Sequence, residues 1–419
     1  MEILICNHYD VCVIGAGPAG IFAALSAKQS VPDARILIIE KKSSPCTKLL
    51  ITGGGRCNIT NSYVSPKDYH TGSPNIVNSI LSSFSNTATV DYFRKLGLDI
   101  VYEESGKAYP SSYKAETVRS TLLQIVDDND IQVLCDHSAV SVNMDNESRW
   151  VITLANNIHL CTRCVIVATG GLSFPATGSD GQFFRYLCED KRFESITPVP
   201  ALVALKLRRE GFWSTYHRYA GITFVGSLSL KKNTTTVLRS HGDILITHTG
   251  VSGPCVFDIS GTVLRHIENP EYTIQLSMSD FCNEADAYKW LVAKRNEFPQ
   301  RSARTILREI LPERLTTLFT QSDENLSAFR KEDLHSLALK LSDTRLFVNS
   351  NLDWEHAEVT SGGICLNQLN PKTLESKRDK GMFFCGEILD VDGRVGGFNL
   401  QWAWSSGWIA GRSVSKYLK

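Results

Sequence analysis

The sequence lacks an excess of charge of either sign, because 44 Lys and Arg residues balance 44 Asp and Glu residues. No overall field therefore draws it toward nucleic acid or a membrane surface, and only a local patch could do so. It also lacks an apolar run near the ~20 residues needed to cross a bilayer. Residues 1–8 contain neither a basic region nor a cleavage site, so we interpret them as a lead-in to the first strand. We expect a cytoplasmic protein without a membrane partner.

Clustered metal ligands are absent as well. The 12 cysteines are scattered, and several, such as Cys12 and Cys255, lie in apolar runs. This distribution is typical of reduced, buried thiols. Cys161 and Cys164 form a C-x-x-C pair that leads into a strand, where residues three apart are too distant for an easy disulfide. We expect no metal site, and a packing role for this pair in preference to redox chemistry.

The most informative segment that is present begins near the N-terminus. An apolar strand at 10–14 leads into the glycine turn 15–20, a helix follows, and a second apolar strand at 35–39 ends in Glu40. In a G-x-G-x-x-G turn the three glycines allow the tight bend, the approach of a pyrophosphate and close helix–strand packing. The acid stands where a carboxylate would hold an adenosine ribose, and it disfavours a 2′-phosphate there. The segment predicts a dinucleotide site, FAD or NAD; an ordinary βαβ turn is the alternative.

The rest of the chain predicts a split domain. Amphipathic periodicity predicts helices at 76–84, 90–96 and 115–126. After about residue 197 short alternating strands appear, a charged helical stretch covers 284–340, and strands return near 345. The short strands are expected at 202–207, 223–230, 236–239, 243–246 and 272–278. We therefore expect an α/β nucleotide-binding domain, residues 1–196 and 346–419, interrupted by an inserted substrate or cap domain, residues 197–345.

A second cofactor segment lies near the C-terminus. An apolar strand at 381–385 ends in Gly386 and Glu387, and the glycine pair 396–397 precedes Asn399 and a helix. FAD is longer than NAD, and an acid such as Glu387 can accept hydrogen bonds from its ribitol hydroxyls. We expect Asn399 to cap the helix, whose N-terminus would favour a negatively charged reduced flavin. The segment favours FAD; a turn that merely closes the sheet is the alternative.

Two long segments resemble a known family. They are Lys48 to Asn61, which contains Gly53-Gly54-Gly55-Arg56-Cys57-Asn58, and Gly386-Glu387 with Gly396-Gly397-Phe398-Asn399-Leu400-Gln401. With shorter matches at 109–110, 168–171, 247–254 and 359–363 they resemble the bacterial FAD-dependent oxidoreductases described as BaiN-like, aminoacetone-oxidase-like or RdsA-like. The resemblance spans almost the whole chain. It implies FAD held between a Rossmann-like domain and an insert made of a β-barrel and helices.

The resemblance also implies the residues that contact FAD. Those of the ADP half are Ile14, Gly15, Gly17, Pro18, Ala19, Gly20, Glu40 and Lys41. Those of the flavin half are Lys48, Gly55, Arg56, Cys57, Asn58, Gly386, Glu387, Gly397, Asn399, Leu400 and Gln401. Thr169 and Gly170 would close over the dinucleotide. The sequence departs from the family pattern at Cys46-Thr47 and at Arg394-Val395, and both departures lie near the expected flavin pocket. Substrate range therefore stays open.

Three residues are candidates for catalysis. Flavin itself transfers the hydride, while the protein orients it and tunes its electronics. Arg56 could stabilise reduced flavin or bind an anionic substrate; alternatively it fixes its loop by hydrogen bonds. Cys57 could be a redox thiol, although packing is favoured. His248, in a glycine-rich turn of the insert, is the acid–base candidate, with a structural histidine as the alternative.

Three functions fit the sequence. The first is an oxidoreductase for a small molecule, with NAD(P)H or O₂ as redox partner; a second G-x-G-x-x-G is lacking, so NAD(P)H would dock directly on the flavin. The second, implied by the RdsA branch, is an RNA reductase that forms dihydrouridine in ribosomal RNA. Arg301, Arg304 and Arg308 recur at helical spacing and could follow phosphates, but interleaved glutamates favour a solvated face. The third is a non-catalytic redox sensor. Oligomeric state is not predicted.

Overall fold

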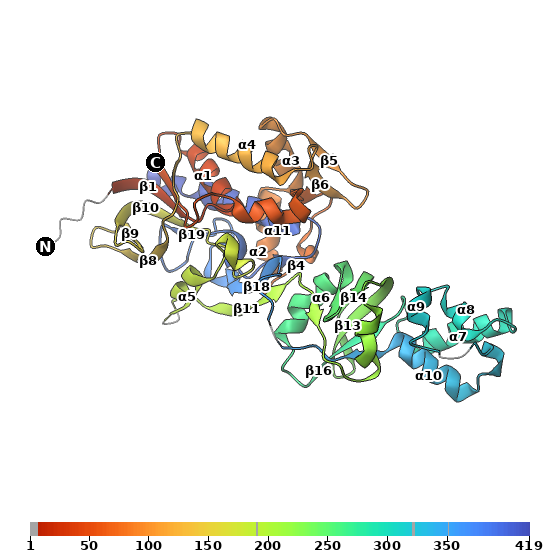
Figure 1. The fold of residues 1–419 in the computed structure, drawn as a ribbon. Coiled ribbons are helices and arrows are strands. Elements are labelled where there is room, and N and C mark those ends of the chain that lie inside the picture. Colours follow the sequence, from red (N-terminus) through yellow and green to blue (C-terminus); the bar gives the residue numbers. More distant parts are fainter. Residues whose placement is uncertain (1–6, 190–191, 321–322, 351) are drawn as a thin grey trace. The chain divides into compact units, whose positions relative to one another are not determined.

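The computed structural model describes residues 7–189, 192–320, 323–350 and 352–419, which form two units (Figure 1). The first unit is Met1–Pro198 with Glu358–Lys419, and the second is Val199–Ala357. The second unit ends later than the expected boundary at 345, because Val348 still pairs with Leu207 in an antiparallel bridge within this unit. Most of the lead-in expected at residues 1–8 lies outside the described residues.

A parallel sheet organises the first unit. Its order is β7 (Gln132–Leu134), β2 (Ile36–Ile39), β1 (Asn7–Ile14) and β10 (His159–Val167), and β19 (Met382–Phe384) pairs with the second half of β10. The residues of β2 are all buried, as expected for parallel strands that are covered on both faces. The predicted strand at the start of the glycine turn is thus central in the sheet.

An antiparallel meander extends the same sheet. β8 (Ala139–Met144) pairs with β9 (Trp150–Leu154), and β9 pairs with the first half of β10. β10 therefore forks, with β9 beside its beginning and β19 beside its end. The fork leaves the carboxyl end of β10 within the parallel part of the sheet.

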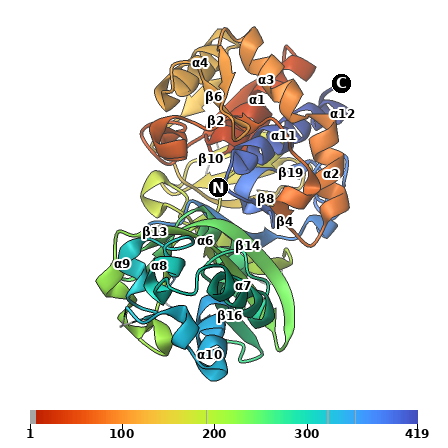
Figure 2. The same cartoon turned by 90° about the vertical axis from the view of Figure 1, so that its right-hand side faces the viewer.

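Two helices of the first unit touch through glycines. α1 (Pro18–Ser30) follows the glycine turn, and α11 (Phe398–Ser413) runs beside it, as both views show (Figures 1 and 2). A Cβ on Gly407 would lie 2.3 Å from the carbonyl oxygen of Ala19, and one on Gly411 would lie 2.0 Å from that of Ala23. The two contacts follow one another in the same direction along both helices. The glycines therefore allow α11 to pack closely against α1.

The other elements of the first unit surround this core. The three helices predicted from periodicity are present as α2 (Pro74–Ser83), α3 (Asn86–Lys95) and α4 (Ala115–Asp128). The remaining helices and strands are β3 (Thr60–Asn61), β4 (Tyr69–His70), β5 (Ile100–Tyr102), β6 (Lys107–Pro110), α5 (Gln182–Cys188), β11 (Ser195–Ala201), β18 (Val359–Ile364), β20 (Asp392–Gly393) and α12 (Ser415–Leu418).

The second unit contains a barrel. Its sheet order is β12-β15-β14-β13-β16-β17, and the edge strands are joined where Arg208 N–H donates to Phe347 O (2.7 Å) and Asn349 N–H donates to Lys206 O (2.7 Å). The strands are β12 (Leu205–Lys206), β13 (Thr223–Lys232), β14 (Thr235–Ile246), β15 (Gly250–Ser252), β16 (Tyr272–Ser277) and β17 (Thr344–Leu346). The helices are α6 (Pro254–Arg265), α7 (Glu284–Glu297), α8 (Ala303–Leu307), α9 (Glu313–Thr316) and α10 (Lys331–Ser342).

The predicted fold class, a Rossmann-like α/β domain with an inserted β-barrel and helices, is confirmed. One detail was wrong: the strands expected at 236–239 and 243–246 are one strand, β14, because residues 240–242 stay in register with β13. In the described ranges, no helix has both the length and the apolar character to span a bilayer.

Candidate cofactor site

The glycine turn is shaped by packing at two of its glycines and is open at the third. Gly15 has φ +105°, and a Cβ there would lie 2.5 Å from Ala168 O. A Cβ on Gly20 would lie 1.9 Å from Gly15 O, whereas one on Gly17 would meet nothing within 4 Å. Gly17 is also the N-cap of α1 and has no side chain to cap the helix. We call the start of α1 and the space beside Gly17 the cradle, because N–H groups at a helix start are groups to which anions can bind.

Glu40 is directed at this cradle. Ala16 N–H donates to Glu40 Oε2 (2.9 Å) and Lys42 N–H donates to Glu40 Oε1 (2.8 Å). The carboxylate is therefore held beside the glycine turn, where the ribose of a dinucleotide would lie. Lys41 turns instead to Asp180, with Nζ 2.7 Å from Oδ1.

The neighbouring residues predicted for the ADP half lie around the same turn. Ile14 ends β1, and Pro18 and Ala19 open α1. Gly386, at φ +78°, packs its backbone on Ala19, since a Cβ there would lie 2.7 Å from Ala19 Cβ. The C-terminal segment thus reaches the glycine turn directly.

The loop after β10 holds two hydroxyls without a protein partner. Thr169 Oγ1 and Ser179 Oγ are buried and make no hydrogen bond to any residue that the structure describes. Gly170, at φ +73°, brings its backbone near the second of them, because a Cβ there would lie 2.9 Å from Ser179 Oγ. Buried hydroxyls are normally satisfied, so these are groups that a ligand could complete. Ser179 was missed in the sequence, where no motif marks it.

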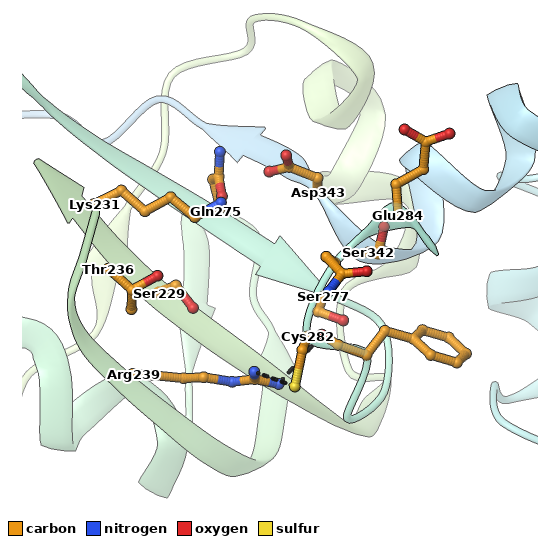
Figure 3. Close-up of a pocket in the computed structure, with 12 residues that line it drawn as sticks. Ser229, Lys231, Thr236, Arg239, Gln275, Ser277, Cys282, Glu284, Ser342 and Asp343 are labelled. Carbon is orange, nitrogen blue, oxygen red and sulfur yellow. Dashed lines mark hydrogen bonds between the residues drawn. The ribbon is translucent and has the colours of Figure 1, made fainter. Parts of the chain in front are cut away.

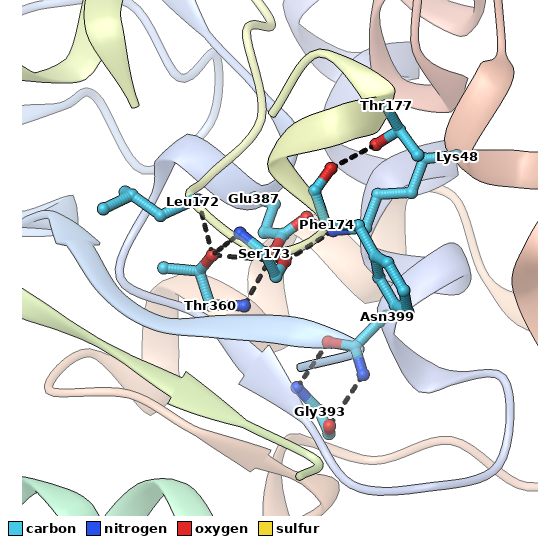
Figure 4. Close-up of polar contacts among 9 residues, drawn as sticks. All are labelled: Lys48, Leu172, Ser173, Phe174, Thr177, Thr360, Glu387, Gly393 and Asn399. Atoms are coloured by element: carbon cyan, nitrogen blue, oxygen red, sulfur yellow. Dashed lines mark hydrogen bonds and ion pairs between the residues drawn. The ribbon is translucent and has the colours of Figure 1, made fainter. Parts of the chain in front are cut away.

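Lys48 and Glu387 meet in a hydrogen-bonded network (Figure 4). Lys48 Nζ lies 2.8 Å from Glu387 Oε2 and donates to Ser173 Oγ (2.6 Å). Ser173 Oγ and Thr360 N–H both donate to Glu387 Oε1, at 2.6 and 2.7 Å. Thr360 Oγ1 in turn accepts from the N–H groups of Leu172 and Ser173. Two residues predicted from distant segments are therefore in contact.

The network keeps Glu387 ionised. Burial by itself would raise the pKa of the Glu387 carboxyl, but the Lys48 ammonium and the hydrogen bonds from Ser173 and Thr360 outweigh it and lower that pKa. The Lys48 and Glu387 side chains are 20% and 22% exposed, so both can still face a ligand. Ser173 is not among the residues predicted from the sequence, and Thr360 is only part of the segment 359–363 that resembles the family.

Arg56 is bonded to its own loop and to the segment 103–109. The preceding glycines 53–55 all have positive φ, between +58° and +83°. Arg56 Nε donates to Gly53 O (3.1 Å), Nη1 lies 3.1 Å from Glu103 Oε1, and Nη2 donates to Tyr109 OH (3.2 Å). This is the arrangement of an arginine that fixes a glycine loop, the alternative considered for it from the sequence. Gly55 is exposed at the end of the same run.

Cys57 is enclosed. Its side chain is fully buried, and burial raises the pKa of its thiol to about 12. A thiol of this kind is protonated at neutral pH and is a poor nucleophile. We therefore expect iodoacetamide to leave Cys57 unmodified in the native protein and to alkylate the exposed Cys282, as read by mass spectrometry of peptides. Native-state labelling of Cys57 would restore it as a redox candidate.

The start of α11 is fastened by two amide side chains. With its amide oriented to satisfy both atoms, Asn58 accepts from Gly397 N–H (2.9 Å) and donates to Thr60 O (2.9 Å). Gln401 is fully buried, accepts from Thr60 Oγ1 (2.6 Å) and donates to Thr89 Oγ1 (2.9 Å). Both side chains make their hydrogen bonds within the protein, so they position α11. The backbone N–H groups at the start of this helix are left for a ligand.

Asn399 does not cap α11, so this expectation was wrong. The N-cap is Gly397, at φ +91°, and Asn399 lies in the first turn. Its side chain instead makes a reciprocal pair with Gly393, accepting from the N–H (2.8 Å) and donating to the carbonyl (2.7 Å) (Figure 4). Leu400 beside it is partly buried against the core. With no side-chain cap, the N–H groups of α11 stay available.

His248 is the residue that the sequence offers for acid–base chemistry. It is exposed in the turn between β14 and β15, in the second unit, whereas all the other candidates belong to the first.

The arginine stripe expected at 301–308 is neutralised. α8 spans only Ala303–Leu307, so the three arginines do not share one helix face. Each forms an ion pair: Arg301 with Glu309 (3.7 Å), Arg304 with Asp323 (3.3 Å) and Arg308 with Glu313 (2.5 Å). The solvated-face alternative therefore describes this segment.

A small polar pocket lies on the barrel of the second unit (Figure 3). Arg239 enters it, and its guanidinium donates to Cys282 Sγ (3.2 Å) and to Asp280 Oδ1 (3.0 Å). Lys231, Glu284 and Asp343 also line it. Charges of both signs share this pocket, and none of the residues predicted for the cofactor belongs to it.

Comparison with known proteins agrees with this fold. Residues 9–413 match the family described as the HI0933-like protein Rossmann domain. The chain belongs to this family. It is 30% identical over 413 residues to the ribosomal RNA dihydrouridine synthase of Escherichia coli (strain K12), covering 97% of this chain and 98% of that protein. It is 28% identical over 411 residues to the 3-dehydro-bile acid delta(4,6)-reductase of Clostridium scindens, covering 96% and 98%.

The family shares its fold with solved structures. The Mycobacterium smegmatis Sdh1 complex in the apo form matches with a TM-score of 0.50 and 14% identity, covering 98% of this chain and 68% of that one. Identity this low indicates a common fold alone. The family resemblance stated for residues 48–61 and 386–401 is confirmed by the match of residues 9–413 to the family model.

Proposed function

We propose that this chain is an FAD-dependent oxidoreductase. The observation that carries the proposal is the position of four predicted residues at the carboxyl ends of four adjacent parallel strands. Glu40 follows β2, Gly15 follows β1, Thr169 comes shortly after β10, and Glu387 comes shortly after β19. Ligands of open α/β sheets bind at this edge.

The two ends of this edge suit the two halves of FAD. The open space at Gly17 and the carboxylate of Glu40 suit a pyrophosphate and a ribose. Glu387, held ionised by Lys48, can accept hydrogen bonds from ribitol hydroxyls, which NAD lacks. The uncapped start of α11 offers N–H groups and a positive dipole to a flavin. When bound, the flavin supplies hydride transfer, and the chain binds and orients it.

A first experiment tests the cofactor and the reductant together. We expect the purified protein to be yellow and to release FAD on denaturation. We also expect NADH or NADPH to bleach the flavin under anaerobic conditions. A colourless protein that binds no added FAD would contradict the proposal. A flavin bleached by neither nucleotide would contradict the NAD(P)H-linked form and leave an oxidase that uses O₂.

A second candidate is a flavin-dependent reductase that forms dihydrouridine in ribosomal RNA. It is favoured by the 30% identity, over 97% of this chain, to a protein named for that activity. The relative named as a bile acid reductase is almost as similar, so a small-molecule substrate competes with RNA. Mapping dihydrouridine in ribosomal RNA from a strain without this protein decides between them, since the RNA candidate requires the loss of a modified position.

A further inference from the structure

A group of cations gathers at one end of the barrel in the second unit. Leu207 N–H donates to Thr249 O (2.9 Å), which places the turn of His248 beside the segment that continues into Arg209. Tyr216 OH donates to Leu207 O (3.1 Å), which brings the neighbouring His217 and Arg218 to the same place. Arg314 Nη2 donates to Arg218 O (3.2 Å). Four separate segments thus contribute basic side chains.

The three arginines of this group are exposed and uncompensated. Within the part of the chain that the structure describes, Arg209, Arg218 and Arg314 form no ion pair. The acids next to them in sequence are taken by other cations: Glu210 lies 3.3 Å from Arg208, and Glu313 lies 2.5 Å from Arg308. The stripe at 301–308, by contrast, is paired throughout.

The positive charges of the neighbouring side chains affect the protonation of His217. His217 is partly buried, and its Nδ1 has no hydrogen-bond partner among the described residues. Burial first, and then the charges of Arg209, Arg218 and His248, lower the pKa of His217. The positive charges of these side chains therefore repel one another, and a bound anion would reduce this repulsion.

We propose that Arg209, Arg218 and Arg314, with His217 and His248, form a surface that binds the phosphates of RNA. Guanidinium groups match phosphate oxygens in a two-pronged geometry. Because these groups are exposed and come from separate segments, they suit a chain of phosphates better than a single enclosed ion. The net charge of the protein is zero, so RNA binding would need such a local patch. The inference extends the second candidate function and rests on it.

The chain offers a matched control for the test. The triple variant R209Q/R218Q/R314Q and the triple variant R301Q/R304Q/R308Q remove the same charge, but only the first removes unpaired cations. With a fluorescein-labelled single-stranded RNA, we expect the first variant to bind at least about tenfold more weakly at 0.1 M salt. Its salt slope should fall by about 2, from three lost phosphate contacts at ~0.7 each. The control should stay within about twofold of the parent protein.

Equal losses in both variants, or an unchanged salt slope in the first, would overturn the proposed surface. So would a flavin-loaded parent protein that binds no RNA. Flavin content and thermal unfolding are measured on each variant, so a folding defect is seen separately. Failure of the proposed oxidoreductase function has a different signature, because the parent protein would then hold no flavin whether or not it bound RNA.

Discussion

A Gly17→Ala variant is expected to fold like the parent protein and to lose most of its affinity for FAD. An added Cβ at Gly17 meets no protein atom within 4 Å, and the backbone there is extended at φ −76°. The same Cβ would enter the space that the pyrophosphate would occupy. Crowding of this kind costs ~1–3 kcal/mol, which corresponds to about a 5- to 150-fold weaker Kd. Titration of apoprotein with FAD measures the Kd, and thermal unfolding of the apoprotein measures the fold.

Gly20→Ala is the contrasting variant. Its Cβ would lie 1.9 Å from Gly15 O, so it clashes with the protein itself. We expect it to destabilise the apoprotein before any cofactor is added. If Gly17→Ala binds FAD as tightly as the parent protein, the open space beside the turn is not the pyrophosphate site.

A Glu387→Gln variant is expected to lose both stability and FAD. The change removes the charge that compensates Lys48, whose side chain is 20% exposed, and one amide hydrogen must now face a donor group. Leaving a partly buried charge unpaired costs ~1–3 kcal/mol. The ribitol would also lose a charged acceptor, so we expect FAD to bind about tenfold more weakly or worse. Urea unfolding of the apoprotein and FAD titration separate the two effects.

Two further variants separate the effect of Glu387→Gln on stability from its effect on FAD binding. Lys48→Met combined with Glu387→Gln should recover part of the stability, because the unpaired charge is gone, but should not recover FAD binding. Glu313→Gln breaks the exposed pair with Arg308, whose side chains are 45% and 71% exposed, and should cost at most ~1 kcal/mol. If Glu387→Gln keeps the parent affinity for FAD, the Lys48–Glu387 network supports the fold and does not bind the cofactor.

Much of the fold could be predicted because its signals are local. The apolar strands around the glycine turn and the periodicity of α2, α3 and α4 each occupy one short window. The boundary at 345 was placed too early because the pairing of Val348 with Leu207 is not local. The break expected in β14 was wrong for the same reason, since its partner strand decides its length.

The candidate site was predictable in its parts but not in its contacts. Lys48 and Glu387 were singled out from separate motifs, yet their contact joins positions 339 residues apart. Ser173 and Ser179 carry no motif and were missed, because only tertiary packing brings their hydroxyls to the site. Arg301 and its neighbours were marked by spacing, but spacing does not reveal which acid neutralises each cation.

By itself the sequence determined the glycine turn, the fold class and the family, because glycine spacing and strand patterns act over a few residues. Only the tertiary structure decided which residues face open space and which are already hydrogen-bonded or ion-paired within the protein. Gly17 is open while Gln401 is fully bonded; among the described residues Arg209 forms no ion pair, while Arg308 is paired with Glu313. The physical reason is that burial, hydrogen bonding and charge compensation depend on partners from distant parts of the chain.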